Sequence, residues 1–233
     1  MTNADTAELA NFHKQAATWW DPQGPMRALH HINPPRLRYI EQCTGGLQGK
    51  RALDIGCGGG LLTEGLAARG AQATGIDLAE TVLDVARQHA AQSQLAVDYR
   101  AISAEALAAA EPASFDLVCC LEMLEHVPDP ASVITAAATL AKPGGALVFS
   151  TINRHPKAFA LAVVGAEYLL NLVPRGTHDY AKFIKPSELT AWARAAGLQP
   201  LQIKGLRYNP ITRIGTMHDD IDVNYFLHCT KPA

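Results

Sequence analysis

The chain has 233 residues, 48% of them hydrophobic, a formal net charge of −2 and a pI near 6.5. This length and apolar content favour a single domain with one large core, and the near-neutral charge excludes the basic surface typical of proteins that bind nucleic acid. The five cysteines are odd in number and form no C-x-x-C pair, and the first residues show no secretory signal, so we expect a protein of the reducing cytoplasm.

Two helical segments are predicted before the first strand. Residues 5–20 predict a helix that ends before the turn-forming sequence Asp-Pro-Gln-Gly-Pro. Trp19 and Trp20 are expected in the core, with the wall of a pocket as the alternative. A second helical stretch is predicted to break at Asn33-Pro34-Pro35 and to end at Gly45-Gly46. These helices are free to cap the cofactor end of the sheet that follows.

From residue 51 the pattern alternates between strands and helices. Strands are expected at residues 51–55, 72–76, 97–102, 115–121 and 146–151, and helices at 61–68, 79–92 and 129–140. Five such units in about 100 residues predict a parallel, doubly wound sheet. Right-handed crossovers place the carboxyl ends of all the strands at one edge, where ligands bind.

The rhythm changes after Thr151. An apolar run, Phe159–Val173, is followed by a predicted helix at 186–196 and by strands at 201–206 and 223–228. We therefore expect one domain over residues 1–233, made of N-terminal helices (1–48), a cofactor-binding core (49–151), a helical insertion (152–197) and terminal strands (198–233).

The predicted insertion has a basic character. Residues 154–185 hold five basic and two acidic side chains, and their apolar residues recur at helical spacing. The apolar run is too short to cross a bilayer. Two interpretations stay open: a core or lid helix, and a helix that lies on an anionic membrane surface.

The glycine run at residues 56–60 is the strongest local signal. Strand residues lead into Gly56-Cys57-Gly58-Gly59-Gly60 and then into a helix, which is the arrangement of a nucleotide-binding turn. Leu61 occupies the sixth position, where the dinucleotide fingerprint has Gly or Ala. Asp54 gives D-x-G-x-G-x-G, which resembles the first motif of the class I S-adenosylmethionine-dependent methyltransferases. A tight turn that binds nothing is the alternative.

Two further positions follow from this resemblance. Asp77 ends the second predicted strand about 20 residues after the loop, where an acid accepts hydrogen bonds from ribose hydroxyls. A cap for the next helix is its alternative role. In the methyltransferase pattern the adenine lies past the third strand, where Ser103 or the backbone would contact it.

A second concentrated signal follows the fourth strand. Glu122, Glu125 and His126 stand at i, i+3 and i+4, so a single helical turn would place them on one face. Two carboxylates and an imidazole suit a divalent cation. The alternative is a histidine that packs or caps without any metal.

Many segments extend the resemblance from Trp19 to the end of the chain. They are Glu122–Pro130, Lys142–Gly145, Ser150–Arg154, Val163–Tyr168, Pro174–Asp179, Tyr208–Pro210 and Asp222–Tyr225. With these segments the chain closely resembles the ubiquinone-biosynthesis O-methyltransferases. The glycine run is common to the wider superfamily, whereas the Gly-Thr-His-Asp and Val-Asn-Tyr sequences are far more specific.

The resemblance implies a Rossmann-like sheet of seven strands completed by a terminal hairpin. It implies S-adenosyl-L-methionine contacts at Arg36, Gly56, Asp77 and Leu121, with Arg36 paired to the carboxylate of the methionine tail. It also implies a divalent cation, Mg²⁺ by preference, held by the Glu122, Glu125 and His126 side chains.

The implied reactions are O-methylations of a polyprenyl catechol (2-polyprenyl-6-hydroxyphenol) and of 3-demethylubiquinol. A bound cation would favour the phenolate form of the acceptor, and the rival is His126 or His178 as a metal-free general base.

A polyprenyl substrate favours peripheral membrane attachment through residues 154–185 and association with other enzymes of the quinone pathway. The alternatives are a methyltransferase for another small phenol or acid, a nucleotide-binding dehydrogenase, and a non-catalytic cofactor-binding module.

Overall fold

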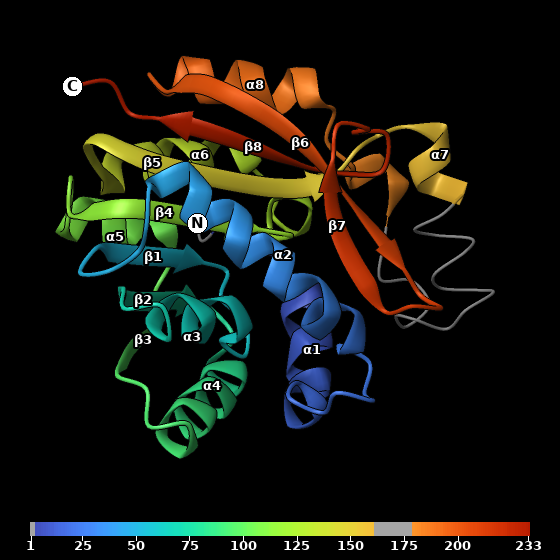
Figure 1. Cartoon of the computed structure of the whole chain (residues 1–233). Coiled ribbons are helices and arrows are strands. Elements are labelled where there is room, and N and C mark those ends of the chain that lie inside the picture. Colours follow the sequence, from blue (N-terminus) through green and yellow to red (C-terminus); the bar gives the residue numbers. More distant parts are fainter. Residues whose placement is uncertain (1–2, 161–178) are drawn as a thin grey trace.

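The computed structural model describes residues 3–160 and 179–233, and its centre is an eight-stranded sheet (Figure 1). The strands are β1 (Arg51–Ile55), β2 (Gln72–Asp77), β3 (Val97–Ala101), β4 (Phe115–Leu121), β5 (Ala141–Ile152), β6 (Gln199–Asn209), β7 (Ile214–His218) and β8 (Asn224–Thr230). Their order is β3-β2-β1-β4-β5-β8-β6-β7. The first five are parallel, and β8, β6 and β7 each run antiparallel to the preceding neighbour.

Helices cover both faces of the sheet. They are α1 (Thr6–Gln15), α2 (Arg27–Thr44), α3 (Leu61–Ala67), α4 (Glu80–Gln92), α5 (Ala104–Ala110), α6 (Pro130–Leu140), α7 (Pro156–Ala158) and α8 (Pro186–Ala195), with short 3₁₀ helices η1 (Ala16–Thr18), η2 (Leu124–His126) and η4 (Tyr180–Lys182). Helices α2 and α3 pack on one face, and α5, α6 and α8 pack on the other.

Strand β4 shows why its sequence forms a central strand. Leu117, Cys119 and Leu121 contact the core under α2 and α3, whereas Val118 and Cys120 contact the core under α5 and α6. Successive side chains of a strand point to opposite faces, so a continuous apolar run is buried on both sides. Strand β4 lies next to β1 in the middle of the sheet, where the strand order reverses. The carboxyl ends of these two strands are where ligands bind in such sheets.

The predicted fold class is confirmed, although the sheet has one strand more than the seven expected. The additional strand, β7, pairs with β6 at the edge of the sheet. It has only five residues, includes Gly215 and follows Arg213, whose φ is +58°. Such a short strand lacks the alternating apolar pattern that announces a half-buried strand.

The predicted break at Asn33-Pro34-Pro35 is wrong, because α2 runs through both prolines. Each proline removes a helical hydrogen bond and crowds the preceding turn, at a cost of about 3 kcal/mol. The helix nevertheless buries Leu37, Tyr39 and Ile40 against the sheet, and each such side chain contributes roughly 1.5–3 kcal/mol. Tertiary packing therefore outweighs the local preference.

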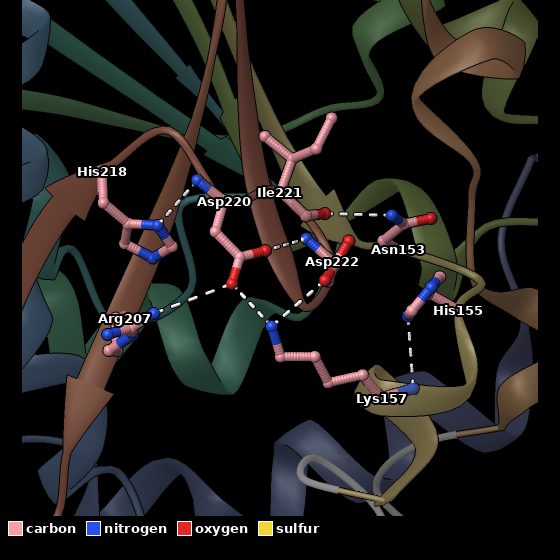
Figure 2. Close-up of polar contacts among 8 residues, drawn as sticks. All are labelled: Asn153, His155, Lys157, Arg207, His218, Asp220, Ile221 and Asp222. Atoms are coloured by element: carbon pink, nitrogen blue, oxygen red, sulfur yellow. Dashed lines mark hydrogen bonds and ion pairs between the residues drawn. The ribbon is translucent and has the colours of Figure 1, made fainter.

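Polar contacts fix the chain where it leaves β5 (Figure 2). Asn153 Nδ2 donates to the Ile221 carbonyl at 2.9 Å, and the Lys157 ammonium lies 2.6 Å from Asp220 Oδ2 and 3.1 Å from Asp222 Oδ2. The start of the predicted insertion is thus tied to the loop between β7 and β8. Most of the apolar run predicted at Phe159–Val173 lies outside the described residues. Within the described ranges, the helices are too short or too polar to traverse a bilayer.

Candidate active site

The glycine run forms a tight turn between β1 and α3. Gly56, Gly58 and Gly60 have φ values of +71°, +52° and +88°, a region that side-chain-bearing residues rarely adopt. The Gly56 and Cys57 amides both donate to the Ile76 carbonyl, at 2.9 and 3.0 Å. These amides are therefore satisfied by β2. The missing Cβ atoms let side chains pack directly on the loop, with Met123 against Gly56 and Trp19 against Gly58.

Asp77 joins the loop to the end of β2. Its Oδ2 accepts the Gly58 amide at 3.0 Å, and its Oδ1 accepts the Ala79 amide at 2.9 Å. Burial raises the pKa of Asp77, and these backbone hydrogen bonds oppose that rise. Each carboxylate oxygen has a second lone pair, so both remain able to accept ribose hydroxyls. The ribose role and the local structural role are compatible at this residue.

A buried pair of charges lies behind the loop. Asp54 is 3% exposed, and Thr63 Oγ1 donates to its Oδ2 at 2.6 Å. Burial raises the pKa of Asp54 to about 7, although the Thr63 hydrogen bond and the charge of Arg36 oppose the rise. Arg36 is 5% exposed; its NH2 atom lies 3.2 Å from Glu122 Oε1, and its buried Nε has no partner among the described residues. An unpaired buried guanidinium nitrogen is costly and therefore points to a missing acceptor.

A cavity of about 200 Å³ connects these groups. Of the site residues predicted from the sequence, it is lined by Arg36, Asp54, Gly56, Gly58, Asp77, Ser103, Leu121, Glu122 and His126. Glu125 does not line it. The structure thus brings nine of ten predicted positions around one space, which lies at the carboxyl ends of β1, β2 and β4.

Ser103 and Leu121 occupy the two sides of this cavity. The Ser103 hydroxyl caps α5 by accepting the Ala106 amide at 3.2 Å, and its side chain also hydrogen-bonds the Glu105 carboxylate. Leu121 is 8% exposed and packs into the core below α2, so it offers the cavity an apolar wall. Neither role requires a charged group.

The predicted helical turn that would align the Glu122, Glu125 and His126 side chains is wrong. Glu122 has a φ of +53° and lies outside the helix, and only Leu124–His126 forms a 3₁₀ turn. Val127 precedes Pro128 and has the extended conformation that a following proline favours, which ends the turn. Spacing of i, i+3 and i+4 aligns residues only when the whole segment is helical.

Glu122 is held by three other side chains. Asn224 Nδ2 lies 2.8 Å from both carboxylate oxygens, Ser150 Oγ donates to Oε1 at 2.6 Å, and Arg36 lies beside Oε1. The donors that hold it come from β8, β5 and α2, and most of them contact Oε1. This explains how a strained backbone is maintained at Glu122.

Glu125 and His126 point to different partners. Thr151 Oγ1 donates to Glu125 Oε2 at 2.8 Å in the core, and burial together with Glu122 raises the pKa of Glu125. His126 Nδ1 lies 3.1 Å from Glu8 Oε2 on α1. Burial lowers the pKa of His126, but Glu8 and the two neighbouring glutamates outweigh it and raise the pKa. Across residues 3–160 and 179–233, no three His, Cys, Asp or Glu side chains are arranged to hold a metal ion, and the three predicted ligands instead contact Asn224, Thr151 and Glu8.

The sequence interpretation left the N-terminal helices free to cap the cofactor end of the sheet, with Trp19 as an alternative pocket wall, but it did not single out Glu8, Phe12 or Asn33. Glu8, Phe12 and Trp19 line the same cavity, together with Asn33, whose Nδ2 donates to the Leu61 carbonyl at 2.8 Å. Only tertiary structure brings these residues to the loop. The tryptophan pair was the one available signal. His178, the rival general base, lies outside the described residues.

Comparison with known structures supports the fold class. Magnesium protoporphyrin IX methyltransferase from Synechocystis PCC 6803 with bound SAH has a TM-score of 0.68, at 19% identity over 95% of this chain and 94% of that one. A Thermotoga maritima structure described as a S-adenosylmethionine-dependent methyltransferase, possibly acting on histamine, has a TM-score of 0.64, at 20% identity over 97% and 99%.

A family model described as a methyltransferase domain matches residues 53–149. With the sheet order and the cavity at its edge, this makes the chain a class I S-adenosylmethionine-dependent methyltransferase. It is 57% identical to the ubiquinone biosynthesis O-methyltransferase of Stutzerimonas stutzeri over 100% of both chains. It is 58% identical to that of Azoarcus sp. over 99% of this chain and 98% of the relative. The chain belongs to the ubiquinone biosynthesis O-methyltransferase family.

Proposed function

We propose that this protein transfers a methyl group from S-adenosyl-L-methionine to phenolic hydroxyls of ubiquinone precursors, namely 2-polyprenyl-6-hydroxyphenol and 3-demethylubiquinol. The observation that carries the proposal is that one cavity joins the glycine run and Asp77 to the turn at Glu122 and His126. The full-length similarity to relatives named for this pathway supports the same substrate class. Methylation of another small phenol or acid is the alternative.

The reaction is an in-line displacement at the methyl carbon. An O–CH₃ bond forms, the S–CH₃ bond breaks, its electron pair returns to sulfur, and the phenol proton leaves to a base or to solvent. The protein's task is to align donor and acceptor within an apolar space. In this proposal Asp77 accepts the ribose hydroxyls, Arg36 binds the methionine carboxylate, and Leu121 and Met123 wall the reacting groups.

Transfer of tritium from labelled S-adenosylmethionine to a short-chain demethylubiquinol analogue tests the activity. We expect labelled product from that analogue and none from a phenol without a neighbouring oxygen. A protein that bound neither the donor nor S-adenosylhomocysteine, but bound a nicotinamide dinucleotide, would be a dehydrogenase-type module and would contradict the proposal.

Substitution at Arg36 tests the carboxylate contact. Arg36→Ala should raise the KM for S-adenosylmethionine by about 10–100-fold, because a hydrogen bond to a charged group contributes roughly 1.5–3 kcal/mol. Arg36→Lys should recover only part of this loss, since an ammonium lacks the planar fork. Arg38→Ala is the matched control, because Arg38 is exposed on the same helix. An unchanged cofactor KM in Arg36→Ala would contradict the assignment.

A divalent cation at Glu122, Glu125 and His126 stays a prediction from the family resemblance, and no step above depends on it. His126, which lines the cavity, is the metal-free candidate for the base. Activity of the enzyme after chelation separates the two: full activity without metal favours His126, and loss that Mg²⁺ restores favours the cation.

Membrane contact through residues 154–185 and association with other quinone-pathway enzymes also stay proposals. Phe159 is 43% exposed, which supports an apolar contact. Arg154 and Lys157 are instead paired with Glu188, Asp220 and Asp222, so their charges are largely balanced within the protein. Co-sedimentation with anionic and neutral vesicles tests the membrane proposal; equal absence from both pellets would contradict it.

A further inference from the structure

Trp19 and Trp20 are adjacent in sequence, but their indole nitrogens differ in hydrogen bonding. Trp20 Nε1 donates to the Gly59 carbonyl at 2.8 Å. Trp19 is 7% exposed, and its buried Nε1 has no hydrogen-bond partner among the described residues. An unpaired donor in a protein interior is rare and unfavourable. The difference suggests that the partner of Trp19 is a molecule other than the protein.

Contacts of Trp20 fix the position of the pair. Its ring stacks on His89 of α4 with the centroids 3.4 Å apart and the planes within 2°. His89 in turn lies 2.8 Å from Glu64 Oε2 of α3. Trp20 thereby fastens the segment after η1 to the glycine run, to α3 and to α4. Because Trp19 is the adjacent residue, these contacts of Trp20 also fix the position of the Trp19 backbone.

Trp19 lies directly against the second and third glycines of the run. A Cβ atom at Gly58 would overlap Cζ2 of the indole, and a Cβ atom at Gly59 would overlap Cδ1 and come within 2.5 Å of Cγ. Gly58 also has a positive φ, but Gly59 does not. The absence of a side chain at Gly59 is therefore explained by the indole and not by the backbone.

The exposed side of this arrangement is the cavity already described. Trp19 lines it together with Asp77, Arg36 and Gly58. Both its indole nitrogen and Arg36 Nε are buried donors for which the described part of the chain supplies no hydrogen-bond partner. The two side chains that carry these donors line a space whose expected ligand is rich in oxygen acceptors, namely a ribose and a carboxylate.

We propose that Trp19 is a cofactor-binding residue: its indole forms a wall of the S-adenosylmethionine site, and Nε1–H donates a hydrogen bond to an oxygen of the bound cofactor. This inference rests on the proposed use of that cofactor. It assigns to the N-terminal segment a direct part in the site, beyond covering the sheet.

The indole resonances provide a direct test. The chain has three tryptophans, and Trp19→Phe identifies the Nε1–H signal of Trp19 in a ¹H–¹⁵N spectrum by its disappearance. Adding S-adenosylhomocysteine should move that signal downfield and leave the signal of Trp192 in place. A matching shift with 5′-methylthioadenosine, which lacks the carboxylate, assigns the ribose as acceptor; a shift with S-adenosylhomocysteine alone assigns the carboxylate.

Calorimetry completes the test. Trp19→Phe keeps an aromatic wall but removes the donor, so the Kd for S-adenosylhomocysteine should rise about tenfold, while Trp192→Phe on α8 binds as the wild type does. If S-adenosylhomocysteine binds the wild type but the Trp19 signal stays fixed and Trp19→Phe binds equally well, the inference is overturned and the proposed function stands. If it does not bind the wild type at all, the proposed function fails as well.

Gly59→Ala supplies an independent check on the packing. In the wild-type background the new methyl group collides with the indole and should raise the Kd at least tenfold. In a Trp19→Ala background the same change should cause no further loss, because the colliding ring is gone. Equal losses in both backgrounds would mean that Gly59 faces the cofactor itself, which would overturn the proposed wall.

Discussion

At the scale of single residues, Asp54 is a buried carboxyl group whose ionised form destabilises the folded protein. Burial raises its pKa to about 7, above the value of 3.8 for an unperturbed aspartate. A carboxyl group whose folded-state pKa is raised favours the folded state in acid. That contribution is lost as the pH rises from about 4 through about 7.

Asp54→Asn should remove this loss. Relative to that of the wild type, the free energy of unfolding of the variant should increase from pH 4 to pH 8, with the melting temperature at pH 8 higher by about 2–8 °C. Thermal unfolding at the two pH values measures it. Cofactor affinity should fall in the same variant, since the neutral amide no longer balances Arg36.

Asp116→Asn is the matched control for that experiment. Burial would raise the pKa of Asp116, but hydrogen bonds from Lys142 and the Arg51 amide outweigh it and lower the pKa. The pKa of Asp116 is therefore shifted in the direction opposite to that of Asp54, so its substitution should not raise the relative stability from pH 4 to pH 8. A pH-independent effect of Asp54→Asn would contradict the raised pKa.

Sequence reasoning succeeded at residues whose position follows from a strand end. The glycine run follows the carboxyl end of β1, and Asp77 lies at the carboxyl end of β2. Because β1 and β2 are parallel neighbours, the proximity of the two follows from the topology alone. It failed for Glu122 and Glu125, because their directions depend on Asn224 of β8 and Thr151 of β5. Contacts between elements far apart in the chain leave no local pattern to read.

At the scale of elements, α2 shows that packing can override a helix-breaking sequence. Pro34 is exposed and Pro35 is buried. Pro34→Ala should therefore stabilise the protein by about 1–3 kcal/mol, because it restores a backbone donor and relieves crowding without losing packing. Denaturant unfolding measures the change.

Pro35→Ala serves as the comparison. The Cγ atom of Pro35 lies 3.1 Å from the position that a Cβ atom on Gly215 would take, so the ring packs closely on β7. Removing it loses contact area along with the strain, and the net gain should be smaller than for Pro34→Ala. A destabilising effect of Pro34→Ala would show that the proline has a role that the helix geometry does not reveal.

The elements missed by the sequence interpretation are all short. Helix α5 has seven residues and β7 has five. Periodicity needs several turns or several alternations before it stands out. The parallel strands β1 to β5 could be predicted from the sequence, because each of them is bounded by clear turn or helix signals.

At the scale of the whole molecule, Gly205 is where the added hairpin meets the sheet. It lies on β6 between β8 and β7, and a Cβ atom there would overlap the Asp220 carbonyl. Gly205→Ala should push away the loop that Figure 2 shows bound by Lys157 and should destabilise the protein by about 2 kcal/mol or more.

Gly215→Ala on the same hairpin is the graded control, because its new methyl group would meet only side-chain atoms of Pro35 and Ile32 and the Ile32 Cα at 3.1–3.2 Å. It should cost clearly less in denaturant unfolding. Equal effects of the two substitutions would contradict the idea that the Asp220 carbonyl is the critical neighbour.

Glu8 lies between two parts of the molecule that the chain separates widely. Its Oε2 lies 3.1 Å from His126 Nδ1 and its Oε1 lies 3.0 Å from Lys182 Nζ of η4, and these partners lower the pKa of Glu8 to about 2. Any ligand that repositions Lys182 therefore also changes the electrostatic surroundings of His126. If such a ligand changes the affinity of the cavity for its occupant, the occupant must change the affinity of the protein for that ligand by the same factor.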